Sequence, residues 1–261
     1  MQLTLAHYSQ DQAFLREDAM HTEAIEYYID DESFTGYLAY DDSIEGERPA
    51  ILLLHEWWGM NDFTREEAER LAAEGFTAFA LDMYGTGVSA DNPSDAGALM
   101  TKTIETEGAP LKRFQAALDL INTHPTVQAG QVAAQGYCFG GAVALTMARL
   151  GLPLKGVVSF HGALESDVKV KPGDITAELQ VYTGGDDAMI PAEHVANFVQ
   201  EMQTAGVRFD VTSYPGVQHG FTNPAATARG EKFGIPLKYD EAAANDAYEG
   251  AVNFYNKIFQ Q

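Results

Sequence analysis

Residues 136–141 read Gly-Tyr-Cys-Phe-Gly-Gly and place a cysteine between two glycines, after an apolar stretch and before a helix-forming one. This is the G-x-S-x-G pattern of a nucleophile elbow, with cysteine in the serine position. In such an elbow the nucleophile occupies a strained turn, and side chains at Gly136 and Gly140 would collide with neighbouring backbone. N–H groups at the start of the following helix favour an anion there, and thiolate over thiol. The pattern indicates Cys138 as a nucleophile. The alternative is a buried structural thiol, the ordinary role of a lone cysteine.

A thiol nucleophile needs a base and a group that orients the base. Two candidates follow later strand-like segments, in the chain order nucleophile, acid, histidine. Asp187 comes shortly after the segment 179–183, and His219 comes shortly after the segment 209–214. Taken singly, Asp187 could be a turn or helix-capping acid, with Asp186 competing for either role, and His219 could be an exposed loop histidine. The ordered combination with the elbow favours catalysis.

The turn after the first buried strand reads His55-Glu56-Trp57-Trp58-Gly59. We expect the N–H of Trp57 to form an oxyanion hole together with the N–H of Phe139. A carboxylate at Glu56 could hydrogen-bond the thiol or take its proton. The alternative is an acid at the end of a strand that points to solvent, and the sequence favours neither.

Strand-like and helix-like segments alternate along the chain. Apolar runs predict strands over 50–56, 77–83, 131–137, 156–161, 179–183 and 209–214, and periodic segments predict helices near 61–74, 94–123 (with a break at 108–110), 140–150, 191–204 and 240–259. Two β-rich runs within 25–39 predict a hairpin. The alternation predicts an α/β fold with a mostly parallel sheet and helices on both faces. Ligands of such sheets sit beyond the carboxyl ends of the strands. Without a linker-like stretch, residues 1–261 are interpreted as one domain.

Composition limits the partners. The 261 residues carry 16 Lys and Arg against 38 Asp and Glu, a net charge of −22, which disfavours nucleic acid and membranes. The first fifty residues hold 12 acidic and two basic residues, so we interpret 1–49 as an acidic extension with a hairpin. A single cysteine excludes an intrachain disulfide and a multi-cysteine zinc site. Residues 1–9 do not resemble a signal peptide, and we expect a cytoplasmic protein that is a monomer or a homodimer.

These residues resemble the dienelactone hydrolase family of the α/β-hydrolases. The resemblance runs from the first buried strand to the last helix, and it rests on the Glu56 turn, Leu81-Asp82-Met83-Tyr84, Gly-Tyr-Cys-Phe-Gly-Gly, Gly-Gly-Asp-Asp with Pro191, and His219-Gly220-Phe221. It implies an α/β-hydrolase fold, no cofactor and hydrolysis of a small ester or lactone by a Cys138–Asp187–His219 triad. The family's additional carboxylate corresponds to Glu56, and the spacing to Pro191 selects Asp187 over Asp186.

One departure from the family concerns specificity. Its type enzymes bind a substrate carboxylate with two arginines, but the corresponding stretches read Gly85-Thr86-Gly87 and Thr222-Asn223-Pro224. The nearest base is Arg229, so a neutral ester or lactone is expected. An aromatic pocket is expected from residues whose alternative role is core packing: Trp57, Trp58, Tyr84, His161 and Phe221.

Three alternative functions account for parts of the sequence. His55, Glu56, Asp82 and His219 could form a metal site, but this would leave the elbow unexplained. A dinucleotide-binding enzyme needs a glycine-rich turn after the first strand, which Gly59 alone does not supply. A catalytically silent binding protein on the same fold is the main alternative, because a fold does not guarantee activity.

Overall fold

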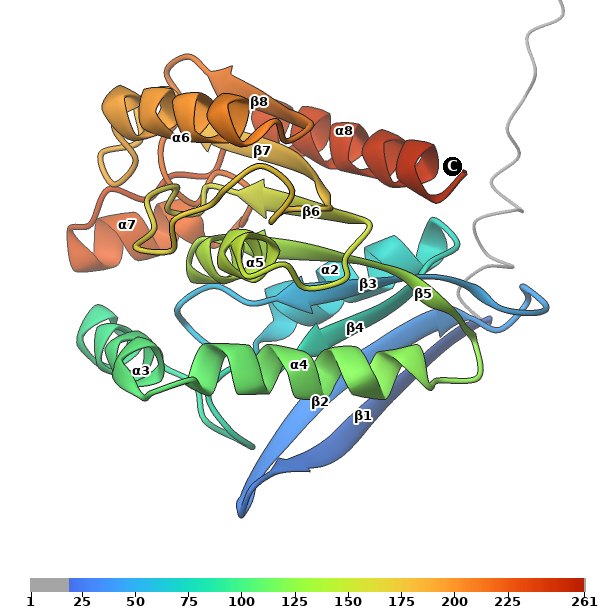
Figure 1. The fold of residues 1–261 in the computed structure, drawn as a ribbon. Helices are drawn as coiled ribbons and strands as arrows, with labels where there is room; N and C mark the ends of the chain where they lie inside the picture. The colour runs from blue at the N-terminus through green and yellow to red at the C-terminus, as the bar shows by residue number, and fades with distance from the viewer. Residues whose placement is uncertain (1–18, 261) are drawn as a thin grey trace, which may run out of the picture.

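The computed structural model describes residues 19–260, which form one eight-stranded sheet with helices packed against it (Figure 1). In chain order the elements are β1 (Met20–Ile29), β2 (Glu32–Asp41), β3 (Arg48–Leu54), α2 (Asp62–Ala73), β4 (Thr77–Leu81), α3 (Pro93–Glu105), α4 (Ala109–Asn122), β5 (Val127–Tyr137), α5 (Phe139–Arg149), β6 (Gly156–Phe160), β7 (Glu178–Gly184), α6 (Ala192–Ala205), β8 (Phe209–Tyr214), α7 (Ala226–Phe233) and α8 (Glu241–Phe259). The part of the acidic extension in residues 1–18 lies outside the described residues.

The strands follow the order β1-β2-β4-β3-β5-β6-β7-β8 across the sheet. From β4 to β8 neighbouring strands are parallel, whereas β2 pairs antiparallel with both β1 and β4. The predicted hairpin is therefore present, and it extends one edge of the parallel sheet. The expected mostly parallel sheet is confirmed.

Successive residues of a strand point to opposite faces of the sheet, and the core is divided accordingly. In β3, Leu52 and Leu54 belong to one apolar cluster, while Ile51 and Leu53 belong to the other. The first cluster also contains side chains of α4, α5 and α6, and the second contains side chains of α2 and α8. Both faces are thus covered by helices (Figure 1), which explains why the central strands are almost uniformly apolar.

Element boundaries agree with the sequence-based expectations to within a few residues. Asn61 caps α2 by accepting a hydrogen bond from the N–H of Thr64, as its position suggested. The expected break within 94–123 lies at Gly108, whose φ of 70° separates α3 from α4. Helix α7 was not expected. It has only 8 residues, and those it buries, Ala226 and Gly230, are small, so its sequence lacks the large apolar side chains that indicate a helix.

The loops that follow the parallel strands meet at one edge of the sheet. Because β3, β5, β6, β7 and β8 are consecutive neighbours, the residues after their carboxyl ends form a continuous row. This row contains the predicted site residues. Among residues 19–260, no helix is long and apolar enough to span a membrane.

Candidate active site

Cys138 lies in the turn between the end of β5 and the start of α5. Its backbone has φ of 53° and ψ of −115°, a positive-φ conformation that is strained for a residue with a side chain. A Cβ atom on Gly136 would lie 2.2 Å from the carbonyl oxygen of Gly140, and one on Gly140 would lie 2.5 Å from the carbonyl oxygen of Leu54. The predicted collisions at both glycines are confirmed. The resulting elbow leaves Cys138 half-buried at the carboxyl edge of the sheet.

Asp187 and His219 are brought together from the loops after β7 and β8. The Nδ1 atom of His219 lies 2.7 Å from Oδ2 of Asp187, and both side chains are almost completely buried. The other carboxylate oxygen of Asp187 accepts hydrogen bonds from the N–H groups of Met189, at 2.8 Å, and Ile190, at 3.2 Å. The carboxylate is therefore held in place by its own loop. Asp186, the competing acid, is exposed.

The protonation of His219 is governed by its neighbours. Burial by itself would lower the pKa of His219, but the negative charge of Cys138 and the hydrogen bond and charge of Asp187 raise it to about 10. An imidazolium is therefore favoured at neutral pH as long as the thiolate is present. Because Nδ1 of His219 is engaged by Asp187, the buried Nε2 is the ring nitrogen that remains for proton transfer.

The turn after β3 places a second group of candidates beside the elbow. Neither the N–H of Trp57 nor that of Phe139 donates a hydrogen bond to another residue of the described chain. Phe139 is the first residue of α5, where the helix dipole adds partial positive charge. Unpaired N–H groups of this kind are the donors from which an oxyanion hole is built.

Glu56 points into the protein and not to solvent. It is 5% exposed, and its Oε2 accepts a hydrogen bond of 2.6 Å from Nδ2 of Asn223. Burial raises the pKa of the Glu56 carboxyl, opposed by the Asn223 hydrogen bond and by the charges of Arg229 and His219. The solvent-facing alternative is thereby excluded.

Asn223 is a site residue that the sequence did not reveal. It is 2% exposed, and its Oδ1 accepts a hydrogen bond from the N–H of Ala225, which orients Nδ2 toward Glu56. The one signal in the sequence is its position four residues after His219, in the stretch where the type enzymes of the family have an arginine.

The five aromatic residues expected to line a pocket differ in exposure. Trp57 is half-buried, whereas the other four are buried. Trp58 packs with Ala96, Ala226 and Leu237 beneath the guanidinium of Arg229, which lies 4.6 Å from its ring centroid. This position indicates core packing for Trp58, the alternative that the sequence had left open.

His161, Phe221 and Tyr84 form a buried layer around the candidate residues. The His161 ring lies edge-on to the rings of His219 and Phe221, with centroids 5.0 and 5.3 Å away. Its Nε2 lies 2.8 Å from the Thr222 hydroxyl, and burial together with the nearby charge of His219 keeps the pKa of His161 well below its usual value. A neutral His161 can pack against the imidazolium of His219 without adding a like charge.

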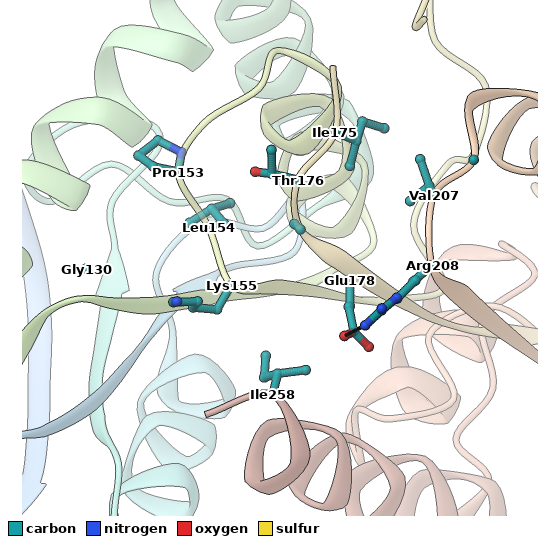
Figure 2. A pocket seen from close by; sticks show the side chains of 12 residues that line it. Gly130, Pro153, Leu154, Lys155, Ile175, Thr176, Glu178, Val207, Arg208 and Ile258 are labelled. Atoms are coloured by element: carbon teal, nitrogen blue, oxygen red, sulfur yellow. Dashed lines mark hydrogen bonds and ion pairs between the residues drawn. The ribbon is translucent and has the colours of Figure 1, made fainter. Parts of the chain in front are cut away.

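Two cavities help to delimit the site. Figure 2 shows one of about 560 Å³, where Glu178 pairs with Arg208 at 3.2 Å. Its lining residues Lys155, Glu178 and Arg208 stand at the amino-terminal starts of β6, β7 and β8, so this cavity lies at the opposite edge of the sheet from Cys138. Another of about 320 Å³ is lined in part by Tyr84 and therefore adjoins the candidate site.

The side chains considered as metal ligands do not form a metal-binding cluster in the described part of the chain. Within residues 19–260, no group of three or more His, Cys, Asp or Glu side chains is arranged to hold a metal ion. His55, which could have contributed to such a group, has both ring nitrogens in contact with backbone atoms.

The variant Cys138→Ala tests the electrostatic link between the thiol and His219. It removes the interaction that contributes most to raising the pKa of His219, so the pKa should fall from about 10, because Asp187 alone then opposes the effect of burial. An NMR titration of the His219 ring, assigned with His219→Gln, would measure this. Equal pKa values in the variant and the unmodified protein would contradict the proposed ion pair.

Comparison with known proteins places the chain in a family. Residues 34–259 match the dienelactone hydrolase family. A protein of Aquifex aeolicus (strain VF5) named "Putative carboxymethylenebutenolidase" is 32% identical over 218 residues, covering 79% of this chain and 87% of the relative. The crystal structure of a dienelactone hydrolase-like promiscuous phosphotriesterase from metagenomic libraries is 31% identical, with a TM-score of 0.83 over 92% of this chain and 99% of that one. An esterase from Thermogutta terrifontis, 17% identical with a TM-score of 0.64 over 91% of this chain and 92% of that one, shares the fold. The expected α/β-hydrolase fold is thus confirmed, and the chain belongs to the dienelactone hydrolase family.

Proposed function

We propose that this hydrolase cleaves small uncharged esters or lactones, with Cys138 as nucleophile, His219 as proton carrier and Asp187 as the residue that orients the imidazole. The observation that carries the proposal is the Asp187–His219 hydrogen bond beside a cysteine held in a strained elbow. The raised pKa of His219 supports a thiolate–imidazolium pair in the resting state.

In the acylation step, the thiolate attacks the carbonyl carbon and a C–S bond forms. The carbonyl electron pair moves to oxygen, and the N–H groups of Trp57 and Phe139 stabilise the oxyanion. When the tetrahedral intermediate collapses, the ester C–O bond breaks and His219 gives its Nε2 proton to the departing alkoxide. The alcohol leaves, or in a lactone stays attached through the acyl chain, and a thioester remains on Cys138.

The second half of the reaction follows from the charge that acylation removes. A thioester sulfur carries no negative charge, so the largest influence that keeps His219 protonated disappears. The neutral Nε2 then takes a proton from water, hydroxide attacks the thioester, and the thiolate leaves. Asp187 holds the same tautomer throughout, because its Oδ2 accepts the Nδ1 proton.

Glu56 is the second proton site of the proposal. Its buried carboxyl has a raised pKa and senses the charge of His219, so it is suited to take up and release a proton beside the imidazole. The hydrogen bond from Asn223 to one carboxylate oxygen favours the ionised form of Glu56, whereas burial favours the protonated form.

The charge around the site favours uncharged substrates. The chain has a net charge of −22, and neither family arginine position carries a base. Arg229, the nearest base in the sequence, lies over the Trp58 ring, and its charge lowers the pKa of Glu56. A carboxylate substrate would have to compete with Glu56 for that cation.

Neutral phosphotriesters are a second substrate class. The observation that favours them is the 31% identical structure titled as a promiscuous phosphotriesterase. The same thiolate would form an S–P bond at phosphorus while the P–O bond to the leaving group breaks. His219 would again supply the proton where the leaving group needs one.

The variant Cys138→Ala should keep the fold and lose hydrolysis of p-nitrophenyl butyrate, because the attacking sulfur is gone. Iodoacetamide should abolish turnover of the unmodified protein, and adding a dienelactone and a neutral phosphotriester to the assay defines the specificity. Retained turnover by Cys138→Ala would show that Cys138 is not the nucleophile. Absence of thiol-sensitive turnover in the unmodified protein would favour the catalytically silent binding protein.

Substitutions of the neighbouring acids Asp187 and Asp186 test which of them orients the His219 ring. Asp187→Asn should lower kcat/KM about 10²–10⁴-fold, because an amide does not select the required tautomer of His219. Asp186→Asn changes an exposed side chain and should alter kcat/KM by less than about twofold. Equal losses in the two variants would show that the orienting acid is misassigned.

A further inference from the structure

We propose that His55 is a positioning residue, which fixes the Glu56–Trp57 peptide so that the N–H of Trp57 is directed at the developing oxyanion. The inference rests on the proposed function, because that function requires the Trp57 N–H as a donor. It adds a role for a buried histidine that neither the triad nor the substrate site uses.

Both ring nitrogens of His55 are committed to backbone groups. Its Nδ1 donates to the carbonyl oxygen of Glu56 at 2.5 Å, and its Nε2 accepts from the N–H of Met83 at 3.1 Å. One donor and one acceptor require a neutral ring with the proton on Nδ1. The ring is completely buried, and burial lowers the pKa of His55, which keeps it neutral.

The contact with the Glu56 carbonyl controls the direction of the Trp57 N–H. A trans peptide is planar, so the C=O of residue 56 and the N–H of residue 57 point in opposite directions. The same carbonyl oxygen also accepts from the N–H of Gly59 at 3.2 Å. Two donors on one side of the peptide therefore orient the unpaired N–H on the other.

A second contact restrains the next peptide. The hydroxyl of Tyr84 donates to the carbonyl oxygen of Trp57 at 2.9 Å. The rings of His55 and Tyr84 pack edge to face, with centroids 4.8 Å apart. Trp57 is thus held by a hydrogen bond on the carbonyl before its N–H and by another on the carbonyl after it.

The hydrogen bonds that hold His55 continue to the segment after β4 and to the buried Arg113. Met83, which donates to His55, follows β4, and its own carbonyl oxygen accepts from Nη1 of Arg113 at 2.6 Å. One nitrogen of the His55 ring is therefore held by the segment that follows β4, and the other contacts the loop that it supports. This arrangement suits a preorganised donor, which must already be in place when charge develops.

The test compares ester hydrolysis with alkylation of the same thiol. Iodoacetamide reacts with a thiolate by direct displacement at a saturated carbon, so no oxyanion forms and the Trp57 N–H is not needed. Hydrolysis of p-nitrophenyl butyrate needs both the thiolate and the oxyanion hole. A variant that only misdirects the N–H should lose hydrolysis and keep alkylation.

Three variants and one control make the experiment decisive. His55→Leu removes both hydrogen bonds and should lower kcat about 10²-fold, while the alkylation rate stays within about threefold. His55→Gln offers an amide donor and acceptor and should recover kcat to within about tenfold of the unmodified enzyme. Tyr84→Phe keeps the ring but removes the contact with Trp57, and should lower kcat about tenfold with alkylation unchanged. Cys138→Ala provides the baseline for both reactions.

The outcomes separate the inference from the function on which it rests. Turnover that persists in Cys138→Ala would overturn the proposed function itself. With Cys138→Ala inactive, full hydrolysis by His55→Leu would overturn the positioning role. Parallel loss of hydrolysis and alkylation in His55→Leu, without rescue by His55→Gln, would show that His55 only packs the core. If His55→Leu does not fold, the other two variants decide. A kcat about tenfold lower in Tyr84→Phe and a kcat of His55→Gln within about tenfold of the unmodified enzyme would support the inference. An unchanged kcat in Tyr84→Phe, together with no hydrolysis by His55→Gln, would overturn it.

Discussion

The positive φ angle of Cys138 is the constraint on which the candidate site depends. A strand must become a helix within one residue, and this is sterically feasible because Gly136 and Gly140 carry no side chains. The sharp turn does two things at once. It places Cys138 at the carboxyl edge of the sheet, and it starts α5 at the next residue, Phe139, whose N–H has no partner in the described chain. The strand order places the other candidate residues nearby, because the loop after β3 lies on one side of the elbow and the loops after β7 and β8 lie on the other.

In the proposed mechanism, the His219 imidazole beside this turn gains and loses a proton during each turnover. With the sulfur ionised, the pKa of His219 is about 10, and the ring is ready to donate a proton. In the proposed acyl intermediate that charge is gone, so the pKa of His219 falls and the ring is better able to act as a base. Neutral neighbours preserve this sensitivity: the pKa of His161 is far below its usual value, so it does not compete for protons, and Asn223 binds Glu56 without adding charge.

Much of this arrangement could be predicted from local sequence. The elbow is encoded within six residues, and the strands are short apolar runs whose order along the chain predicts a mostly parallel sheet. The preference for Asp187 over Asp186 came from the spacing to Pro191, and the structure agrees by burying Asp187 and exposing Asp186. The elbow and the strands follow from backbone geometry and from periodicity, which a single sequence displays, whereas the choice of Asp187 rests on the family resemblance.

The remaining features depend on contacts between distant segments. Asn223 meets Glu56 across 167 residues of chain, and no spacing rule links an amide in one loop to a carboxyl in another. His55 could be read as a metal ligand, because only the fold shows that Met83 occupies one ring nitrogen and the Glu56 carbonyl the other. Trp58 and Phe221 are aromatic residues of the kind that often line pockets, but the structure buries them in apolar clusters. Helix α7 buries too few apolar side chains to leave a pattern.

The central claim is that a covalent acyl group resides on Cys138 during turnover. The most direct measurement is mass spectrometry of protein quenched with acid while it hydrolyses p-nitrophenyl butyrate, followed by peptide mapping. If Cys138 is the nucleophile, the mass increases by one butyryl group, which is located on the peptide that contains Cys138 and is removed by hydroxylamine. A butyryl group on a different residue, or rapid turnover with no acylated protein at any quench time, would contradict it.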